Sequence, residues 1–295
     1  MGAGDREFES HHSDHYEYTM LENRFLLNTA EPMQDDLLRM RRTEVEYGLV
    51  PLPRTTYSSF ISHFHDWITQ SQNDLRGFNK FEREVCVGTT HFIDNLIMLH
   101  GLENLQIFEH DYIYYRKLMP GKQWAILGEL KEKQPLLIAL PFPGYGAIHP
   151  LMDSILNECL SKQIPVHIDG CWMSCAKGIE FDFSHPAIHS VAFSLSKGLD
   201  LGWNRIGVRY SKQINHNDSI TIVNNSNMIN TMNVKVGELF MKQFPADYLW
   251  KKYGNIYHKV CKRWLIKPTN CIHMGRRFDT GAVVGLRRAI EEYHD

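Results

Sequence analysis

The chain has 295 residues, of which 43% are hydrophobic and 22% are charged. That is ordinary globular composition, and the length suits one large domain or two smaller ones. The formal net charge of -2 gives no bulk electrostatic reason to expect nucleic acid or an anionic membrane as a partner. No apolar run approaches the ~20 residues that span a bilayer, so we expect no membrane association.

The cysteine and histidine usage bounds the chemistry further. The six cysteines are scattered and form no C-x-x-C pair, so we expect reduced thiols in a cytoplasmic protein. His91, His100, His110 and His149 show no H-x-x-x-H or H-E-x-x-H spacing, so we expect no metal site. The first residues are polar and acidic, unlike a secretory signal.

The first 82 residues are predicted to be a tail followed by helices. We expect a flexible tail over residues 1–20 and a helical segment over 21–82. One helix is predicted from about Pro32 to Tyr47. A second helix is predicted within 56–76, because its apolar residues recur at steps of three and four, at Phe60, Ile61, Phe64, Trp67 and Ile68.

Strand and helix patterns alternate from about residue 83. Strands are predicted at 84–87, 104–108, 135–140, 165–169, 191–195 and 206–210, with helices after 89, after 112 and after 150. Thr89 or Thr90 is predicted to cap the first of these helices. The nearly all-apolar run from Pro135 to Leu140 is typical of a sheet covered on both sides. We therefore expect a three-layer α/β large domain with a mostly parallel sheet over residues 83–235.

The C-terminal part is predicted to be mostly helical. Residues 211–230 are polar and rich in asparagine, which predicts a loop. Residues 231–266 are predicted to be helical, with a break at Phe244-Pro245-Ala246, and a final amphipathic helix is predicted near the end. We expect 236–295 to be a helical part that forms a reduced small domain.

Chemistry-bearing residues follow three predicted strands. Asp169 ends one strand, Lys197 follows another, and Thr89 and Thr90 occupy a strand-to-helix turn. Ligands of open α/β sheets bind at the carboxyl ends of strands, so these residues are expected to converge. A lysine that forms a Schiff base, a carboxylate that faces a pyridine nitrogen, and groups that hold a phosphate make up a pyridoxal phosphate (PLP) site. The side chains that would hold the phosphate are Arg205, eight residues after Lys197, and Ser194 and Ser196.

Four segments carry a family resemblance over roughly residues 84–210. They are Gly88-Thr89-Thr90, the run His110 to Tyr115, Ile168-Asp169-Gly170-Cys171-Trp172, and Ser194-Leu195-Ser196-Lys197 with Arg205. In this order and spacing they resemble the PLP-dependent aminotransferase class I/II family, which has the type I PLP fold. The resemblance implies that Tyr112 stacks on the cofactor ring and that Trp172 donates from its indole to the ring's phenolic oxygen.

The chain also departs from the family pattern. Phe142 stands where the family has an asparagine that hydrogen-bonds the phenolic oxygen, and Trp172 replaces a tyrosine. The region after Tyr210 is short, so the arginine for the substrate's α-carboxylate is not fixed by a motif. Arg276, Arg277, Arg287 and Arg288 are the candidates.

The resemblance implies an aminotransferase that acts on an amino acid or related amine through a Lys197 Schiff base. It implies PLP as the cofactor, a keto acid as the second substrate, and a homodimer. Two alternatives stay open: other PLP chemistry at Cα, as in a lyase or decarboxylase, and a PLP-binding fold without turnover.

Overall fold

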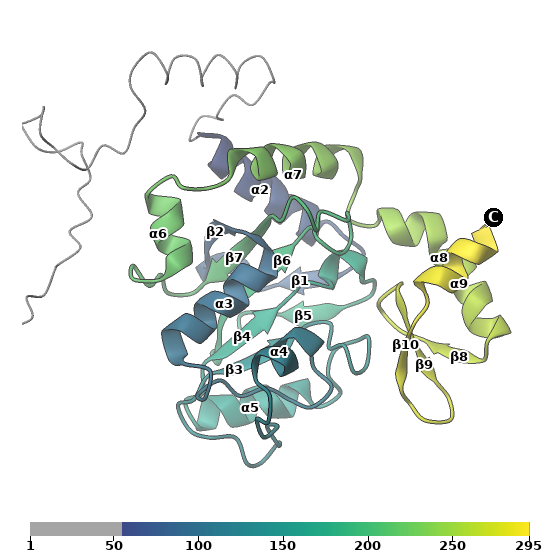
Figure 1. Cartoon of the computed structure of the whole chain (residues 1–295), viewed down its shortest axis with the longest axis horizontal. Helices are drawn as coiled ribbons and strands as arrows, with labels where there is room; N and C mark the ends of the chain where they lie inside the picture. Colours follow the sequence, from purple (N-terminus) through teal and green to yellow (C-terminus); the bar gives the residue numbers. More distant parts are fainter. Residues whose placement is uncertain (1–54, 295) are drawn as a thin grey trace, which may run out of the picture. The chain divides into compact units, whose positions relative to one another are not determined.

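The structure of the protein is a computed structural model that describes residues 55–294 (Figure 1). The tail expected over 1–20 and the helix expected at Pro32–Tyr47 lie outside the described residues. No helix within the described range is both long and apolar enough to cross a membrane.

A five-stranded sheet organises the larger part of the described chain. Its order is β2-β7-β6-β4-β3, with strands β2 (Glu82–Cys86), β3 (Leu136–Ala139), β4 (Val166–Asp169), β6 (Ile188–Ser194) and β7 (Gly207–Ser211). Strands β3, β4 and β6 pair in parallel, whereas β7 runs antiparallel to both β6 and β2. Only β7 is therefore reversed, which confirms the expectation of a mostly parallel sheet.

Helices cover both faces of this sheet. One face carries α3 (Gly88–His100), α4 (Ile113–Leu118) and α6 (Ser219–Asn225). The other carries α2 (Thr55–Thr69), α5 (Met152–Ser161) and α7 (Thr231–Gln243). Alternation along β6 feeds both layers, because Ala192 packs into the first core while Val191 and Phe193 pack into the second. The three-layer α/β architecture is confirmed, as is the amphipathic helix around Phe60 and Phe64.

The C-terminal elements, called the C-terminal unit below, lie beside the sheet (Figure 1). The unit holds α8 (Tyr248–Arg263), α9 (Arg287–His294) and a three-stranded antiparallel sheet of β8 (Ile266–Pro268), β9 (Met274–Arg277) and β10 (Val283–Gly285). Its core contains Trp250, Tyr257 and Ile290. The break at Pro245 is confirmed, since α7 ends at Gln243 and α8 begins at Tyr248. The sequence did not predict the three strands, because they are only three or four residues long and partly exposed.

Two further expectations were wrong in detail. The 211–230 stretch contains α6, whose first turn is capped by Asp218 accepting from the Thr221 amide at 2.8 Å. Polar composition predicted a loop, but Arg209 holds Asp218 at 2.6 Å and fixes the start of the helix. Residues 104–108 make only isolated bridges, Gln106 to Leu136 and Phe108 to Ala125.

Smaller elements complete the description. Strands β1 (Asp74–Arg76) and β5 (Glu180–Asp182) pair in parallel as a two-stranded sheet. Single 3-10 turns occur at η2 (Phe78–Lys80) and η3 (Met173–Cys175).

Candidate functional site

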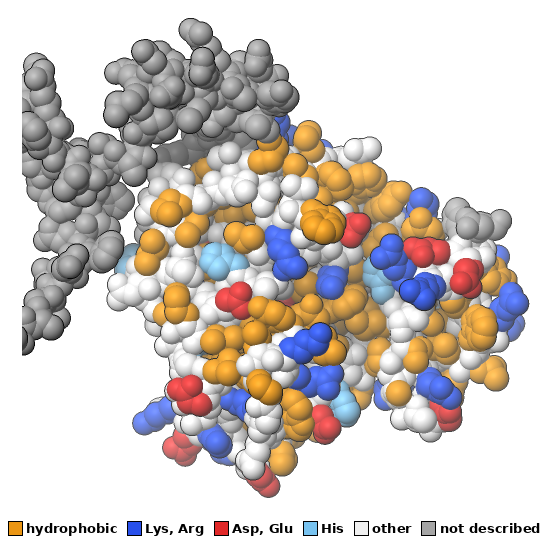
Figure 2. All heavy atoms as spheres, viewed as in Figure 1, with side chains coloured by type: hydrophobic (Ala, Val, Ile, Leu, Met, Phe, Trp, Pro, Cys, Tyr) orange, Lys and Arg blue, Asp and Glu red, His pale blue; other side chains and the backbone are white. Residues whose placement is uncertain are grey.

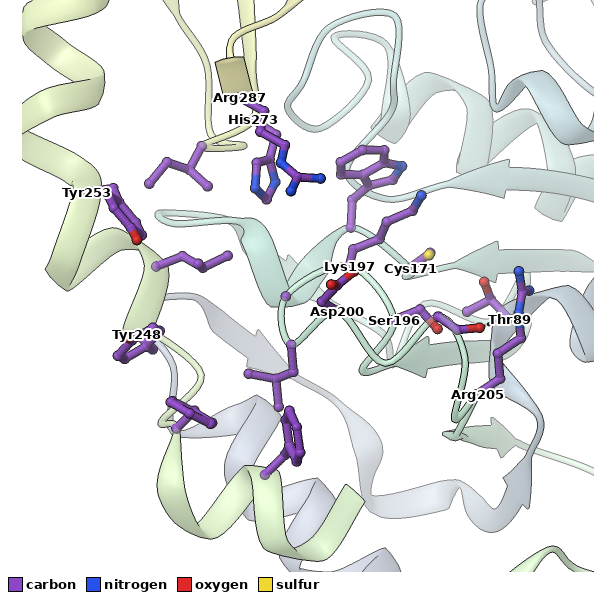
Figure 3. A pocket seen from close by; sticks show the side chains of 18 of the residues that line it. Thr89, Cys171, Ser196, Lys197, Asp200, Arg205, Tyr248, Tyr253, His273 and Arg287 are labelled. Carbon is purple, nitrogen blue, oxygen red and sulfur yellow. Dashed lines mark hydrogen bonds between the residues drawn. The ribbon is translucent and has the colours of Figure 1, made fainter. Parts of the chain in front are cut away.

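A cavity of about 700 Å³ opens at the carboxyl ends of β4 and β6, beside the C-terminal unit (Figure 3). Seven of the nine predicted site residues line it, and Asp169 and Ser194 are the two that do not. In Figure 3, Thr89, Ser196 and Arg205 lie together at one end, Tyr248 and Tyr253 at the other, and Lys197 between them. The lining residues from the predicted set are Thr89, Thr90, Tyr112, Trp172, Ser196, Lys197 and Arg205.

The polar end is built where β2 passes into α3. Gly88 has φ of 68°, a left-handed conformation that favours glycine, and it turns the chain into the helix. A Cβ added to Gly88 would meet Ser196 Oγ at 3.6 Å and the Cβ atoms of Ser194 and Arg205 at 3.9 Å. The glycine therefore leaves a small open space, called the Gly88 cradle below, between the end of β2 and the segment that follows β6.

The same turn begins a helix without a side-chain cap. The N-cap residue is Val87, so the prediction that Thr89 or Thr90 caps the helix was wrong. Both threonines occupy the first turn instead, and Thr90 Oγ1 accepts from Arg205 Nη1 at 2.6 Å. Amide groups of a first helical turn lack intrahelical partners, and together with an arginine they favour an anion.

Lys197 lies between two aromatic rings. Its Nζ is 4.9 Å from the Trp172 ring centroid and 5.9 Å from that of Tyr112. The indole Nε1 of Trp172 is buried and finds no hydrogen-bond partner among the described residues. An orphaned buried donor of this kind calls for a ligand acceptor, since leaving it unpaired costs about 1–3 kcal/mol.

Asp169 lies behind the cavity wall and is 1% exposed. Its Oδ2 accepts from Tyr115 Oη at 2.7 Å and its Oδ1 accepts from the Cys171 amide at 2.9 Å. Burial raises the pKa of the Asp169 carboxyl, while bonds from Tyr115, Cys171 and Thr89 and the nearby Lys197 charge oppose that rise. A cationic ligand group near this carboxylate would favour its ionised form.

A second buried carboxyl supports the site from just before α4. Asp111 is 2% exposed and accepts from the Tyr112 amide at 2.6 Å and the Ala139 amide at 3.2 Å. Burial raises the pKa of Asp111 to about 8, and the charge of Asp169 adds to the rise. Asp111 thereby ties the segment that carries Tyr112 to the end of β3.

Ser194 and Phe142 lie away from the cavity. The Ser194 hydroxyl is buried and points at Cys171 Sγ, 3.7 Å away. Phe142 is 1% exposed and packs its ring edge-on against His149. The position aligned with the family asparagine is therefore part of the hydrophobic core.

One of the four candidate arginines reaches the cavity. Arg287 lines it and donates from Nε to Glu291 at 2.9 Å. Arg276 lies over the Tyr145 ring, and Arg277 pairs with Asp279. Arg287 is thus the arginine placed to meet a ligand beside Lys197.

Several lining residues were not predicted from the sequence. They come from α7, α8, α9 and the segment before β9, and they include Phe240, Phe244, Tyr248, Tyr253, Ile272, His273 and Glu291. Burial lowers the pKa of His273, and the charges of Arg287 and Lys197 lower it further. None of these positions carries a motif. Tyr115 was missed as well, although it lies in the same segment as Tyr112.

Comparison with known proteins gives a match at the level of structure only. The sequence matches no protein-family model, and no curated protein resembles it significantly. The structure is similar to an aromatic aminotransferase from Pyrococcus horikoshii OT3, with a TM-score of 0.53 and 13% identity over 83% of this chain and 76% of that one.

Two further solved structures, both of aminotransferases, are similar to this chain to about the same degree. A histidinol-phosphate aminotransferase from Clostridium acetobutylicum gives a TM-score of 0.52 and 12% identity over 80% and 78% of the two chains. A probable N-succinyldiaminopimelate aminotransferase from Thermus thermophilus gives 0.50 and 14% over 82% and 83%. The chain has the fold of the class I/II aminotransferases, which confirms the resemblance at the level of fold.

The described residues fit PLP in three respects. The Gly88 cradle beside Thr90, Ser196 and Arg205 suits a phosphate. The orphaned Trp172 Nε1 suits a phenolic oxygen. The buried Asp169 carboxyl, at the end of the strand next to the one that leads into Lys197, suits a pyridinium nitrogen.

Proposed function

We propose that this chain is a PLP-dependent aminotransferase that holds its cofactor through a Schiff base on Lys197. The carrying observation is that the Gly88 cradle, the buried Asp169 and Lys197 follow or end β2, β4 and β6 at one edge of the five-stranded sheet. Fold alone would be a weak argument, because one fold hosts many functions. Here the residue types at those strand ends are the ones that the chemistry requires.

Each residue has a physical role in the proposal. The fork of Arg205 and the hydroxyls of Thr90 and Ser196 bind the phosphate, with Ser194 as a more distant member of that group. The Tyr112 ring packs on the cofactor ring, and Trp172 Nε1 donates to its phenolic oxygen. Thr89 orients Asp169, whose negative charge keeps the pyridine nitrogen protonated.

PLP supplies an aldehyde that exchanges amines and a ring that accepts the electrons left at Cα. Lys197 supplies the remaining chemistry from the protein side. With PLP bound, the Nζ of Lys197 would be the group that moves the proton at Cα of the substrate. Arg287 binds the carboxylate of an amino acid substrate and of the keto acid product.

Two more features of the proposal follow the family resemblance. Trp203 is 97% exposed and directly follows Gly202, which lines the cavity, so a homodimer interface at this face would bury its ring. Light scattering of the parent and of Trp203→Ser tests this, and a monomeric parent would rule it out. All six cysteines are buried and unpaired, which supports a cytoplasmic location.

The visible spectrum tests the cofactor tether. With PLP, the parent should show an absorption band that borohydride abolishes and that leaves the cofactor attached to the chain. Lys197→Ala should lack this band, whereas Lys177→Ala, which lies over Trp250 outside the cavity, should keep it. A reducible band that survives in Lys197→Ala would refute the tether.

A half-reaction then separates the alternatives. Under the proposal, the amine form of the cofactor accumulates when an amino acid is added without a keto acid. Loss of carbon dioxide or of a side-chain group instead would indicate a decarboxylase or a lyase. A yellow protein that is inert with every amine would indicate binding without turnover.

A further inference from the structure

We propose that the substrate of this cavity is a primary amine with one large apolar group, aromatic or branched aliphatic, and that dicarboxylic amines are selected against. This inference rests on the proposed function, because it takes Lys197 as the place where the substrate amine reacts. It adds which part of the chain selects the substrate.

The wall opposite the Gly88 cradle is aromatic. Phe240 and Phe244 lie on or just after α7, with ring centroids 5.7 Å apart, and Phe244 meets Tyr248 edge-on at 5.0 Å. Trp67 Nε1 donates to the Phe244 carbonyl at 2.8 Å, which anchors the junction between α7 and α8 to α2. The three rings form a continuous row along one side of the cavity.

Aliphatic side chains extend this apolar wall on the C-terminal unit. Leu249 on α8, Ile272 before β9 and Ile290 on α9 all line the same cavity. In Figure 3, Tyr248 and Tyr253 lie well away from Thr89, Ser196 and Arg205, with Lys197 between the two groups. Figure 2 shows hydrophobic, basic, acidic and histidine side chains together where the C-terminal unit meets the rest of the described chain. A cofactor at the polar end would thus leave an apolar space for the substrate's side chain.

The charges around that space limit what else it accepts. Arg205 faces the cradle and Lys197 is the reacting amine, so Arg287 is the remaining cation among the described lining residues. Glu291 accepts from Arg287 at 2.9 Å, and Asp200 is close enough for its charge to act on Arg287 as well. One substrate carboxylate can pair with Arg287 alongside Glu291. A second substrate carboxylate would be repelled by Asp200 and Glu291 and would find no further cation among the described lining residues.

The test measures binding to the PLP-loaded parent by the shift of its visible band. Amino acids with a methyl group on Cα are suitable probes, because they have no Cα proton to lose and so bind without turnover. We expect α-methylphenylalanine to bind about tenfold or more tightly than α-methylaspartate, as expected when a buried aromatic side chain is set against an unpaired carboxylate.

Two variants and one control assign the selectivity to named residues. Phe244→Ala should reduce the preference for the aromatic probe by roughly fivefold or more, and Phe244→Leu should restore much of it. Leu239→Ala, on the exposed side of α7, is the control and should leave the preference unchanged. Glu291→Gln should strengthen α-methylaspartate binding by roughly two- to fivefold, a gain that misfolding cannot produce.

The outcomes separate the two levels of the argument. If no borohydride-sensitive band forms with PLP, the proposed function fails, and this inference fails with it. If the band forms but α-methylaspartate binds as well as the aromatic probe, the inference alone is overturned. Equal effects of Phe244→Ala and Leu239→Ala would also overturn it.

Discussion

The two ends of the cavity differ in how they are built. The polar end is made by short segments at strand ends, where Gly88, Thr90, Ser196 and Arg205 meet. The apolar end is made by side chains of α7, α8, α9 and the segment before β9. A phosphate or pyridine ring demands particular donors and charges, whereas an apolar side chain demands only shape and exclusion of water. The first kind of demand leaves a motif in the sequence and the second does not.

Phe142 lies where the polar end of the cavity stops. Replacing it should change the free energy of unfolding more than the other single substitutions below. Phe142→Asn restores the family residue but places an amide in a core site that is 1% exposed. We expect a loss of about 3–5 kcal/mol in the free energy of unfolding, measured with denaturant, and no gain in PLP affinity. Tighter PLP binding by this variant would show that the polar end reaches the segment after β3, which would contradict the boundary drawn here between the two ends.

Removing the charge of Asp169 should weaken the polar end without loosening the fold. Asp169→Asn keeps the shape and an acceptor for Tyr115, but it cannot pair with a pyridinium. We expect PLP affinity to fall roughly 10- to 100-fold in equilibrium titration, with the melting temperature of the PLP-free protein unchanged or higher. Unchanged affinity would show that Asp169 is only a buried structural carboxyl.

Changing the proposed phosphate contact of Arg205 should have a smaller effect on PLP affinity, and that effect should depend on the shape of the side chain. Arg205→Lys keeps the charge but loses the two-pronged fork and the bond to Thr90 Oγ1. We expect roughly tenfold weaker PLP binding, and weaker binding of inorganic phosphate by the PLP-free protein. Arg76→Lys, which is on β1 and pairs with exposed Asp74, is the matched control. Equal affinities for both variants would remove Arg205 from the cradle.

The last prediction concerns the dependence of stability on pH and the carboxyl behind the polar end. The pKa of Asp111 is about 8 in the folded chain and its ordinary value is 3.8, so between these values the native state holds the extra proton. Stability should therefore fall as pH rises through that window, by at most about 1.4 kcal/mol per pH unit. Asp111→Asn should flatten the profile of unfolding free energy against pH.

The control for this pH effect is Glu109→Gln, at a side chain 61% exposed. It should leave the slope as in the parent. If Asp111→Asn also kept the parent's slope, burial would not be holding a proton on Asp111.

Much of the sheet and the polar end could be predicted from the sequence. Strands such as Leu136–Ala139 are buried on both faces, and full burial leaves an apolar run that periodicity detects. Asp169 and Lys197 were predicted because one ends such a strand and the other follows one, and the carboxyl ends of parallel strands meet at one edge. Arg205 was predicted from its spacing of eight residues after Lys197. Local sequence thus determined the strands of the five-stranded sheet and which polar residues lie at the ends of β4 and β6.

Tertiary structure decided the rest of the cavity. Whether Arg276, Arg277, Arg287 or Arg288 approaches Lys197 depends on how α9 and three short strands fold against α8, and strands of three or four residues carry too little pattern to read. Phe240, Phe244 and Tyr248 could equally have been ordinary core residues until the α7–α8 junction turned them toward the cavity. Contacts between distant segments, which no local pattern encodes, set the apolar end of the cavity.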